Sequence, residues 1–290
     1  MIQLASNDIS QTTKDRLSAL QNQIDREATF AEKAEKAKSL WSGKSGSNAG
    51  KAAFDDVKSV LESMCVSVEV CNYCEQNEAN DIEHIAPKSF FPEWAFVWDN
   101  YLLACKQCNS GYKLDKCHVL DDSGILYTTE RGNEPIHKTH CFINPRTENP
   151  NDFLILNMMT YTFQCVPGLT TKDKNKAEKT LEILQLNERD KLIEARRKAA
   201  IYYYDRLERL TNVLEATTLQ EVTQILTPAD NPVDLKMDLT ANQEIIKQNI
   251  KNDILTHQHP SVWYAIKTVG RIVNVQWSNL FNQIPEAQNW

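Results

Sequence analysis

The chain has 290 residues, 41% of them hydrophobic, and a formal net charge of −7. This length and composition are typical of a globular protein with one large or two smaller cores, and they exclude a disordered tail. No apolar run reaches the roughly eighteen residues of a membrane helix, and the polar stretch Gln3–Arg16 excludes a signal peptide, so we expect a cytoplasmic protein.

The first predicted element is a long amphipathic helix over Gln11–Trp41. Apolar residues recur along it at spacings of three and four, namely Leu17, Leu20, Ile24, Ala31 and Ala34. The glycine-rich segment 43–51 that follows is not a phosphate-binding loop, because its glycines are too close together. We interpret it as a linker, so that residues 1–50 form a mobile N-terminal helix that docks a partner or self-associates.

A second helix is predicted over Lys51–Met64. Phe54, Val57 and Leu61 lie along one side of it. We expect this apolar side to pack on the segment that follows, and we assign both to a domain over residues 51–120.

Two Cys-x-x-Cys pairs lie within that domain. A pair with this spacing presents two thiolates to one metal, and two pairs complete a tetrahedral zinc site. Because sulfur closes all four positions, this zinc is expected to be structural. Its predicted ligands are Cys71, Cys74, Cys105 and Cys108. The chain has eight cysteines, half of them in zinc spacing, which fits a reducing compartment better than a disulfide framework.

Between the cysteine pairs the sequence predicts two short strands, Asp81–Ile85 and Asn100–Ala104, joined by a loop that contains prolines. After Cys108 the pattern becomes helical, and Asn109 is suited to cap the start of the helix. The expected arrangement is therefore strand, strand and helix around a metal.

Five more residues of metal-ligating type follow the second cysteine pair. They are Cys117, His118, His137, His140 and Cys141. These side chains could form a second metal site, but their spacing does not constrain a ligand geometry, and they could equally be ordinary structural residues.

Residues 121–290 are predicted to form a mainly helical domain. Turn signals at Asn144-Pro145 and Asn149-Pro150 limit regular structure at its start. Helical periodicity then covers Lys176–Leu186, Glu188–Leu210, Asn242–His257 and Ser261–Val273. We interpret the apolar stripes of these helices as core, with Tyr203 among them. The expected fold is α+β and mainly α-helical, with a small zinc-stapled module embedded between helical segments.

The residues around the cysteine pairs resemble the HNH, or ββα-metal, nuclease family. That family's motif has an acidic residue followed by His and Ile, then an Asn before an apolar strand, then a His or Asn at the start of a helix. The matching residues here are Glu83-His84-Ile85-x-Pro87, Asn100 before Tyr101-Leu102-Leu103, and Asn109.

The resemblance implies a role for each of these residues in hydrolysing a phosphodiester bond to a 5′ phosphate and a 3′ hydroxyl. It makes His84 the general base, Glu83 and Asn109 the ligands of a catalytic divalent cation, and Asn100 the residue that holds the His84 loop. Because Asn109 stands where His is also found, we expect magnesium or manganese. Two lysines, Lys106 and Lys113, are candidates for phosphate contacts, or are ordinary solvated lysines.

A looser similarity, over roughly residues 51–287, links the chain to the HNH nuclease subunit of Septu-type and retron-associated anti-phage systems. The segments that carry it are Phe142–Pro150, Ala177–Asn187 and Pro260–Glu286. This similarity implies a bacterial defence nuclease that cleaves DNA and is held in check by an ABC-like or SMC-like ATPase.

The net negative charge agrees with a partner that supplies part of the DNA-binding surface, because lysine and arginine dominate non-specific DNA affinity. We therefore expect the chain to bind DNA weakly by itself. The alternative hypothesis is a catalytically idle zinc-binding adaptor.

Overall fold

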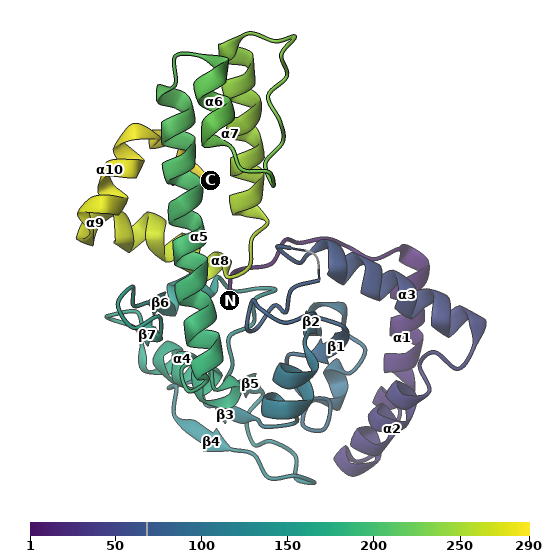
Figure 1. Ribbon diagram of the computed structural model, residues 1–290. Coiled ribbons are helices and arrows are strands. Elements are labelled where there is room, and N and C mark those ends of the chain that lie inside the picture. The colour runs from purple at the N-terminus through teal and green to yellow at the C-terminus, as the bar shows by residue number, and fades with distance from the viewer. Residues whose placement is uncertain (68) are drawn as a thin grey trace. The chain divides into compact units, whose positions relative to one another are not determined.

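The computed structural model describes residues 1–67 and 69–290 (Figure 1). The chain is mainly helical with small sheets, as the sequence predicts. It forms two compact units, one of Met1–Ile155 with Phe163–Arg189 and one of Leu156–Thr162 with Asp190–Trp290. The division at residues 50 and 120 expected from the sequence differs from this one, because the segments on both sides of the cysteine pairs fold into the first unit.

The N-terminal part of the first unit contains three helices, α1 (Gln11–Asp25), α2 (Phe30–Ser42) and α3 (Asn48–Ser63). The single helix predicted over Gln11–Trp41 is therefore wrong, because the chain turns back between α1 and α2, which pack together (Figure 1). The break has a local cause. Thr29 accepts a hydrogen bond from the backbone of Glu32, and the Glu32 carboxylate accepts one from the backbone of Thr29, so a capping box starts α2.

The glycine-rich segment between α2 and α3 is a compact turn. The Gly46 amide donates to the Gly43 carbonyl (2.9 Å), and the Ser47 hydroxyl caps α3 by accepting from the Gly50 amide (3.1 Å). A Cβ atom at Gly50 would lie 2.2 Å from the Lys44 carbonyl oxygen. Only glycine therefore permits this close approach of the turn to the first turn of α3.

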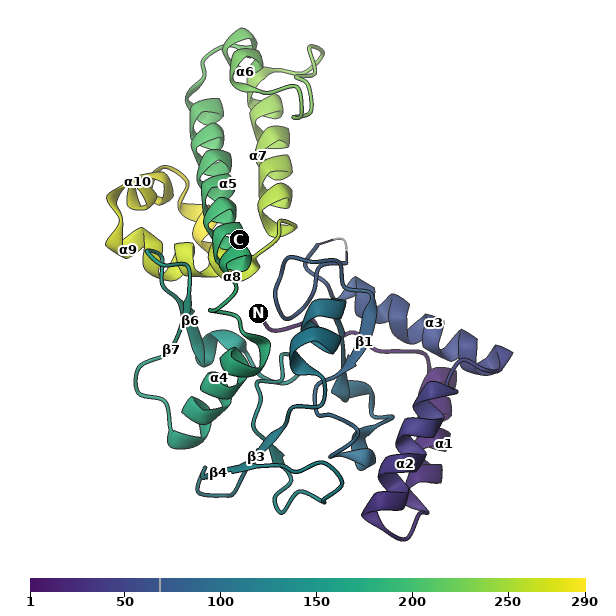
Figure 2. The same cartoon turned by 60° about the horizontal axis from the view of Figure 1, so that its bottom comes forward.

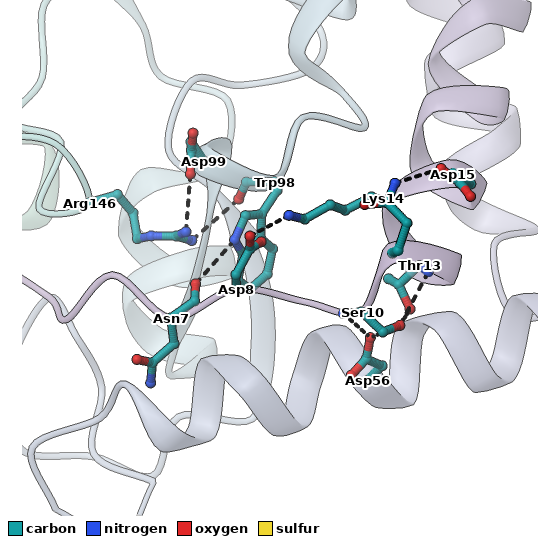
Figure 3. A network of polar contacts seen from close by, with 11 residues as sticks. Asn7, Asp8, Ser10, Thr13, Lys14, Asp15, Asp56, Trp98, Asp99 and Arg146 are labelled. Carbon is teal, nitrogen blue, oxygen red and sulfur yellow. Dashed lines mark hydrogen bonds and ion pairs between the residues drawn. The ribbon is translucent and has the colours of Figure 1, made fainter.

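Polar contacts anchor the segment that precedes α1 (Figure 3). The Ser10 hydroxyl donates to the Asp56 carboxylate on α3 (2.8 Å). The Trp98 indole donates to the Asn7 carbonyl (3.3 Å), and the Arg146 guanidinium stacks on the Trp98 ring, 4.4 Å from its centroid. These contacts tie the start of the chain to α3 and to the region of the cysteine pairs, in place of the mobile helix expected from the sequence.

A short antiparallel hairpin forms the centre of the first unit. Strands β1 (Asp81–His84) and β2 (Tyr101–Ala104) pair in the register Glu83↔Leu102 and His84↔Tyr101, and a π-helix, η3 (Gln107–Lys113), follows β2. The predicted order of strand, strand and helix is confirmed. Helix α3 packs against β2, so its buried side chains cover the hairpin.

The rest of the first unit consists of small sheets and one helix. The strands β3 (His118–Leu120), β4 (Leu126–Thr128) and β5 (Thr139–His140) form an antiparallel sheet in the order β4-β3-β5. Strands β6 (Leu154–Leu156) and β7 (Phe163–Cys165) pair with each other. Helix α4 (Thr171–Leu184) packs against η3. Short 3₁₀ turns also occur at Pro92–Trp94, Trp98–Asn100 and Pro150–Asp152.

The second unit is built on the long helix α5 (Asp190–Glu215), which runs beside α7 (Leu239–Leu255) (Figure 2). Tyr203 is buried in α5, as its position on the apolar stripe predicts. The remaining elements are α6 (Leu219–Ile225), α8 (Pro260–Ala265), the π-helix η5 (Ile266–Gly270), α9 (Arg271–Val273), α10 (Val275–Gln283) and the 3₁₀ turn Pro285–Asn289. In the described part of the chain, no helix combines the length and the apolar character needed to span a membrane.

The tight turn before α3 leads to a testable prediction. Gly50→Ala should destabilise the first unit by about 1–3 kcal/mol, because the added methyl group meets a backbone carbonyl that cannot move independently. Gly43→Ala is the matched control. A Cβ atom at Gly43 would lie 3.6 Å from the nearest atom, and the φ of Gly43 is −92°. Thermal unfolding of both variants measures the difference, and equal midpoints would contradict this account of the turn.

Candidate functional site

The four cysteines of the two Cys-x-x-Cys pairs come together in one buried cluster. The Sγ atoms of Cys71, Cys74, Cys105 and Cys108 all lie within 4.8 Å of one another. The first pair precedes β1, and the second follows β2 at the start of η3. The cluster therefore joins the two ends of the hairpin.

The geometry of the cluster fits a tetrahedral zinc ion. A zinc–sulfur bond of about 2.3 Å places the sulfur atoms of a tetrahedron about 3.8 Å apart, and Cys74 Sγ lies 3.9 Å from Cys105 Sγ. Burial raises the pKa of the Cys71 thiol well above its usual range, so ionised sulfur here requires a nearby positive charge. A zinc ion would supply that charge, and the Arg189 guanidinium adds to it by donating to Cys108 Sγ (3.4 Å).

His84 ends β1 and lies in an aromatic environment. Its Nε2 atom is 2.9 Å from the Ala95 carbonyl oxygen, which also accepts the hydroxyl of Tyr101 (2.6 Å). The Trp41 ring of α2 packs against the imidazole, with ring centroids 4.2 Å apart. Since a carbonyl only accepts, Nε2 carries the proton in the neutral tautomer, and Nδ1 keeps its lone pair.

Burial lowers the pKa of His84 well below its ordinary value, and the positive charge of Lys88 lowers it further. The imidazole is therefore neutral at physiological pH. A neutral imidazole with a fixed Nε2 proton is the form that accepts a proton at Nδ1.

Asn100 fastens the loop that follows His84. Its Oδ1 accepts from the Ala86 amide (2.8 Å), and its Nδ2 donates to the carbonyls of Ala86 and Trp94 (both 3.0 Å). The backbone carbonyl of Asn100 also accepts from the Ile85 amide (2.9 Å). One buried amide therefore connects both ends of the loop between the strands.

Glu83 is buried beside Lys113, and the two side chains form an ion pair. The Lys113 ammonium also donates to the His84 carbonyl (2.7 Å). Burial raises the pKa of Glu83, and the charge of Lys113 opposes this effect. Because Lys113 has no exposed surface, it does not fit the phosphate contact predicted from the sequence, and it is a structural partner of Glu83 instead.

Asn109 lies inside η3 and does not cap it, because the residue before the first turn is Lys106. The predicted cap is therefore wrong. Asn109 Nδ2 donates to the Asp81 carboxylate of β1 (3.1 Å), which orients the amide. No sequence motif points to Asp81 in this role, since the contact depends on the packing of η3 across β1.

A cavity of about 640 Å³ connects these groups, since Glu83, His84 and Asn109 all contribute to its lining. The other lining residues include Lys88, Arg131 and the α2 residues Ala34 and Lys38. No motif identified them. Lys106 is exposed and is not among the lining residues.

The five residues that could have formed a second metal site do not form one. Within residues 1–67 and 69–290, the four-cysteine cluster is the one group with suitable ligand geometry. His140 packs between Phe91 and Phe142, and His137 packs on Tyr127. These histidines are therefore part of aromatic packing.

Comparison with known proteins agrees with the geometry. Residues 71–113 match the model of the HNH endonuclease family, which confirms the resemblance for this part of the chain. The chain is 28% identical over 151 residues, 52% of its length, to the Septu protein PtuB of Bacillus thuringiensis. The match spans about half (47%) of that relative. No solved structure matches the chain.

The cluster predicts different effects for different cysteines. Cys105→Ser should reduce bound zinc from about one equivalent to nearly none and unfold the hairpin, because the metal supplies on the order of ten kcal/mol of folding free energy in such sites. Cys165→Ser, on β7 outside the cluster, should leave zinc content and folding unchanged. Elemental analysis and circular dichroism measure both, and equal zinc in the two variants would contradict the assignment.

Proposed function

We propose that the chain is a metal-dependent endonuclease that hydrolyses phosphodiester bonds of DNA. The observation that carries the proposal is the cavity that brings Glu83, His84 and Asn109 together within the segment matched to the HNH endonuclease family. A phosphodiester is already anionic, so its hydrolysis requires a strong nucleophile and compensation of the developing negative charge. The cavity offers side chains for both tasks.

His84 is the proposed general base. Its Nε2 is engaged with the Ala95 carbonyl, so Nδ1 accepts the proton of the attacking water. The lowered pKa keeps this nitrogen free of a proton at neutral pH. Asn100 is proposed to hold the loop that includes Ala95, and thus to fix the orientation of the ring.

Glu83 and Asn109 are proposed to hold a catalytic magnesium or manganese ion. Carboxylate and amide oxygens are the ligands that these cations prefer, and two protein ligands are sufficient because such ions keep several waters. The bond from Asn109 Nδ2 to Asp81 leaves the Oδ1 end of the amide for the ion. When bound, the ion would neutralise charge on the phosphate and stabilise the leaving 3′ oxygen.

The biological context is proposed from the similarity to the Septu protein and from charge. We propose that the chain is the nuclease of a bacterial anti-phage system, of Septu or retron-associated type, and that an ABC-like or SMC-like ATPase regulates it. The formal charge of −7 supports a partner that completes the DNA-binding surface. The free cysteines fit the reducing cytoplasm.

The test is cleavage of supercoiled plasmid with magnesium or manganese. His84→Ala should reduce the rate by about 10²- to 10⁴-fold, the typical contribution of a general base, and should leave zinc content unchanged. His137→Ala, which removes a histidine outside the cavity, is the matched control. Equal cleavage by all three proteins would contradict the assignment of the base. Folded, zinc-bound protein without activity in any condition, a co-purified partner included, would favour the idle zinc-binding adaptor.

A further inference from the structure

Two lysines lie at the aromatic ring that packs on His84. The Nζ atoms of Lys44 and Lys88 are 4.6 Å and 5.7 Å from the centroid of the Trp41 ring. Trp41 in turn packs on His84. Lys44 belongs to the turn between α2 and α3, whereas Lys88 follows β1 and lines the cavity.

Neither ammonium group forms an ion pair within the described residues, and the Glu83 and Asp115 carboxylates attract Lys88 only from a longer distance. Among the residues that the structure describes, no carboxylate oxygen lies within 4.0 Å of the Nζ atom of Lys44 or Lys88. Lys113 is different, because Glu83 neutralises it. Two half-buried cations that share one aromatic ring repel each other, and an anion bound between them would remove this cost.

The chain maintains this arrangement through a backbone constraint. Gly50 allows the turn to approach α3 so closely that a Cβ atom there would meet the Lys44 carbonyl. Trp41 and Lys44 also lie outside the segment 71–113 that matches the HNH endonuclease family. The N-terminal part of the chain therefore adds charged and aromatic groups to the proposed catalytic site.

We propose that Lys44 and Lys88, beside the Trp41 ring, bind a backbone phosphate of the nucleic acid adjacent to the phosphate that is cleaved. This inference rests on the proposed function, because it places the phosphate next to His84. It gives residues 41–44 a direct part in substrate binding. It also explains how a chain of net negative charge holds a polyanion at this point.

The test measures binding separately from cleavage. Protein that carries His84→Ala is titrated with a fluorescent DNA duplex over a range of salt concentrations. Each phosphate contact adds about 0.9 to the slope of log K against log salt for a duplex. Adding Lys44→Gln or Lys88→Gln should therefore lower the slope by about 0.9 each, and Lys44→Arg and Lys88→Arg should restore it.

Lys236→Gln is the control. It removes the same charge from an exposed position of the second unit. Its salt slope should equal that of the parent protein, so a loss specific to Lys44 and Lys88 supports the phosphate site. An unchanged slope in Lys44→Gln and Lys88→Gln, or an equal loss in all three variants, would overturn it. So would full displacement of the duplex by a 5′-mononucleotide, which would assign the site to free nucleotides.

The plasmid assay separates the two proposals. If wild-type protein cleaves DNA while the lysine variants keep their salt slope, the phosphate site is wrong and the nuclease assignment stands. If the lysine variants lose the slope and wild-type protein does not cleave, the binding site stands and the catalytic assignment fails.

Discussion

The four-cysteine cluster is the constraint on which the rest of the site depends. Strands β1 and β2 have four residues each, and a hairpin of this size is marginally stable by itself in water. The cluster joins the chain before β1 to the chain after β2, so one zinc ion bound there would fix both ends of the hairpin. His84 at the end of β1 and Asn109 in η3 owe their positions to this closure.

Buried polar contacts, together with the cysteine cluster, hold the residues of the site in place. Asn100 fastens the loop after His84, and Lys113 ties η3 to β1 through Glu83 and the His84 carbonyl. A buried ion pair adds little net stability, but loss of one partner leaves an uncompensated charge and is costly. The pair therefore acts as a geometric constraint, which holds Glu83 at the cavity beside His84.

The sequence allowed prediction of those parts of the site that depend on local spacing. The two Cys-x-x-Cys pairs predicted the cluster, and the pattern from Asp81 to Ala104 predicted the hairpin. The contacts that could not be predicted join distant segments. Trp41 reaches His84 only because α2 folds back on α1, and the burial of Lys113 depends on the packing of η3. The capping box at Thr29 and Glu32 was the local signal that could have divided the first predicted helix.

We propose that one metal builds the fold and a different metal serves the chemistry. The most direct test is to remove loosely bound cations from the purified protein with a mild chelator, and then to measure zinc content and plasmid cleavage before and after magnesium or manganese is restored. The account predicts that zinc stays bound throughout while cleavage is lost and then returns with the added cation. Cleavage that follows zinc content and ignores magnesium and manganese would contradict it.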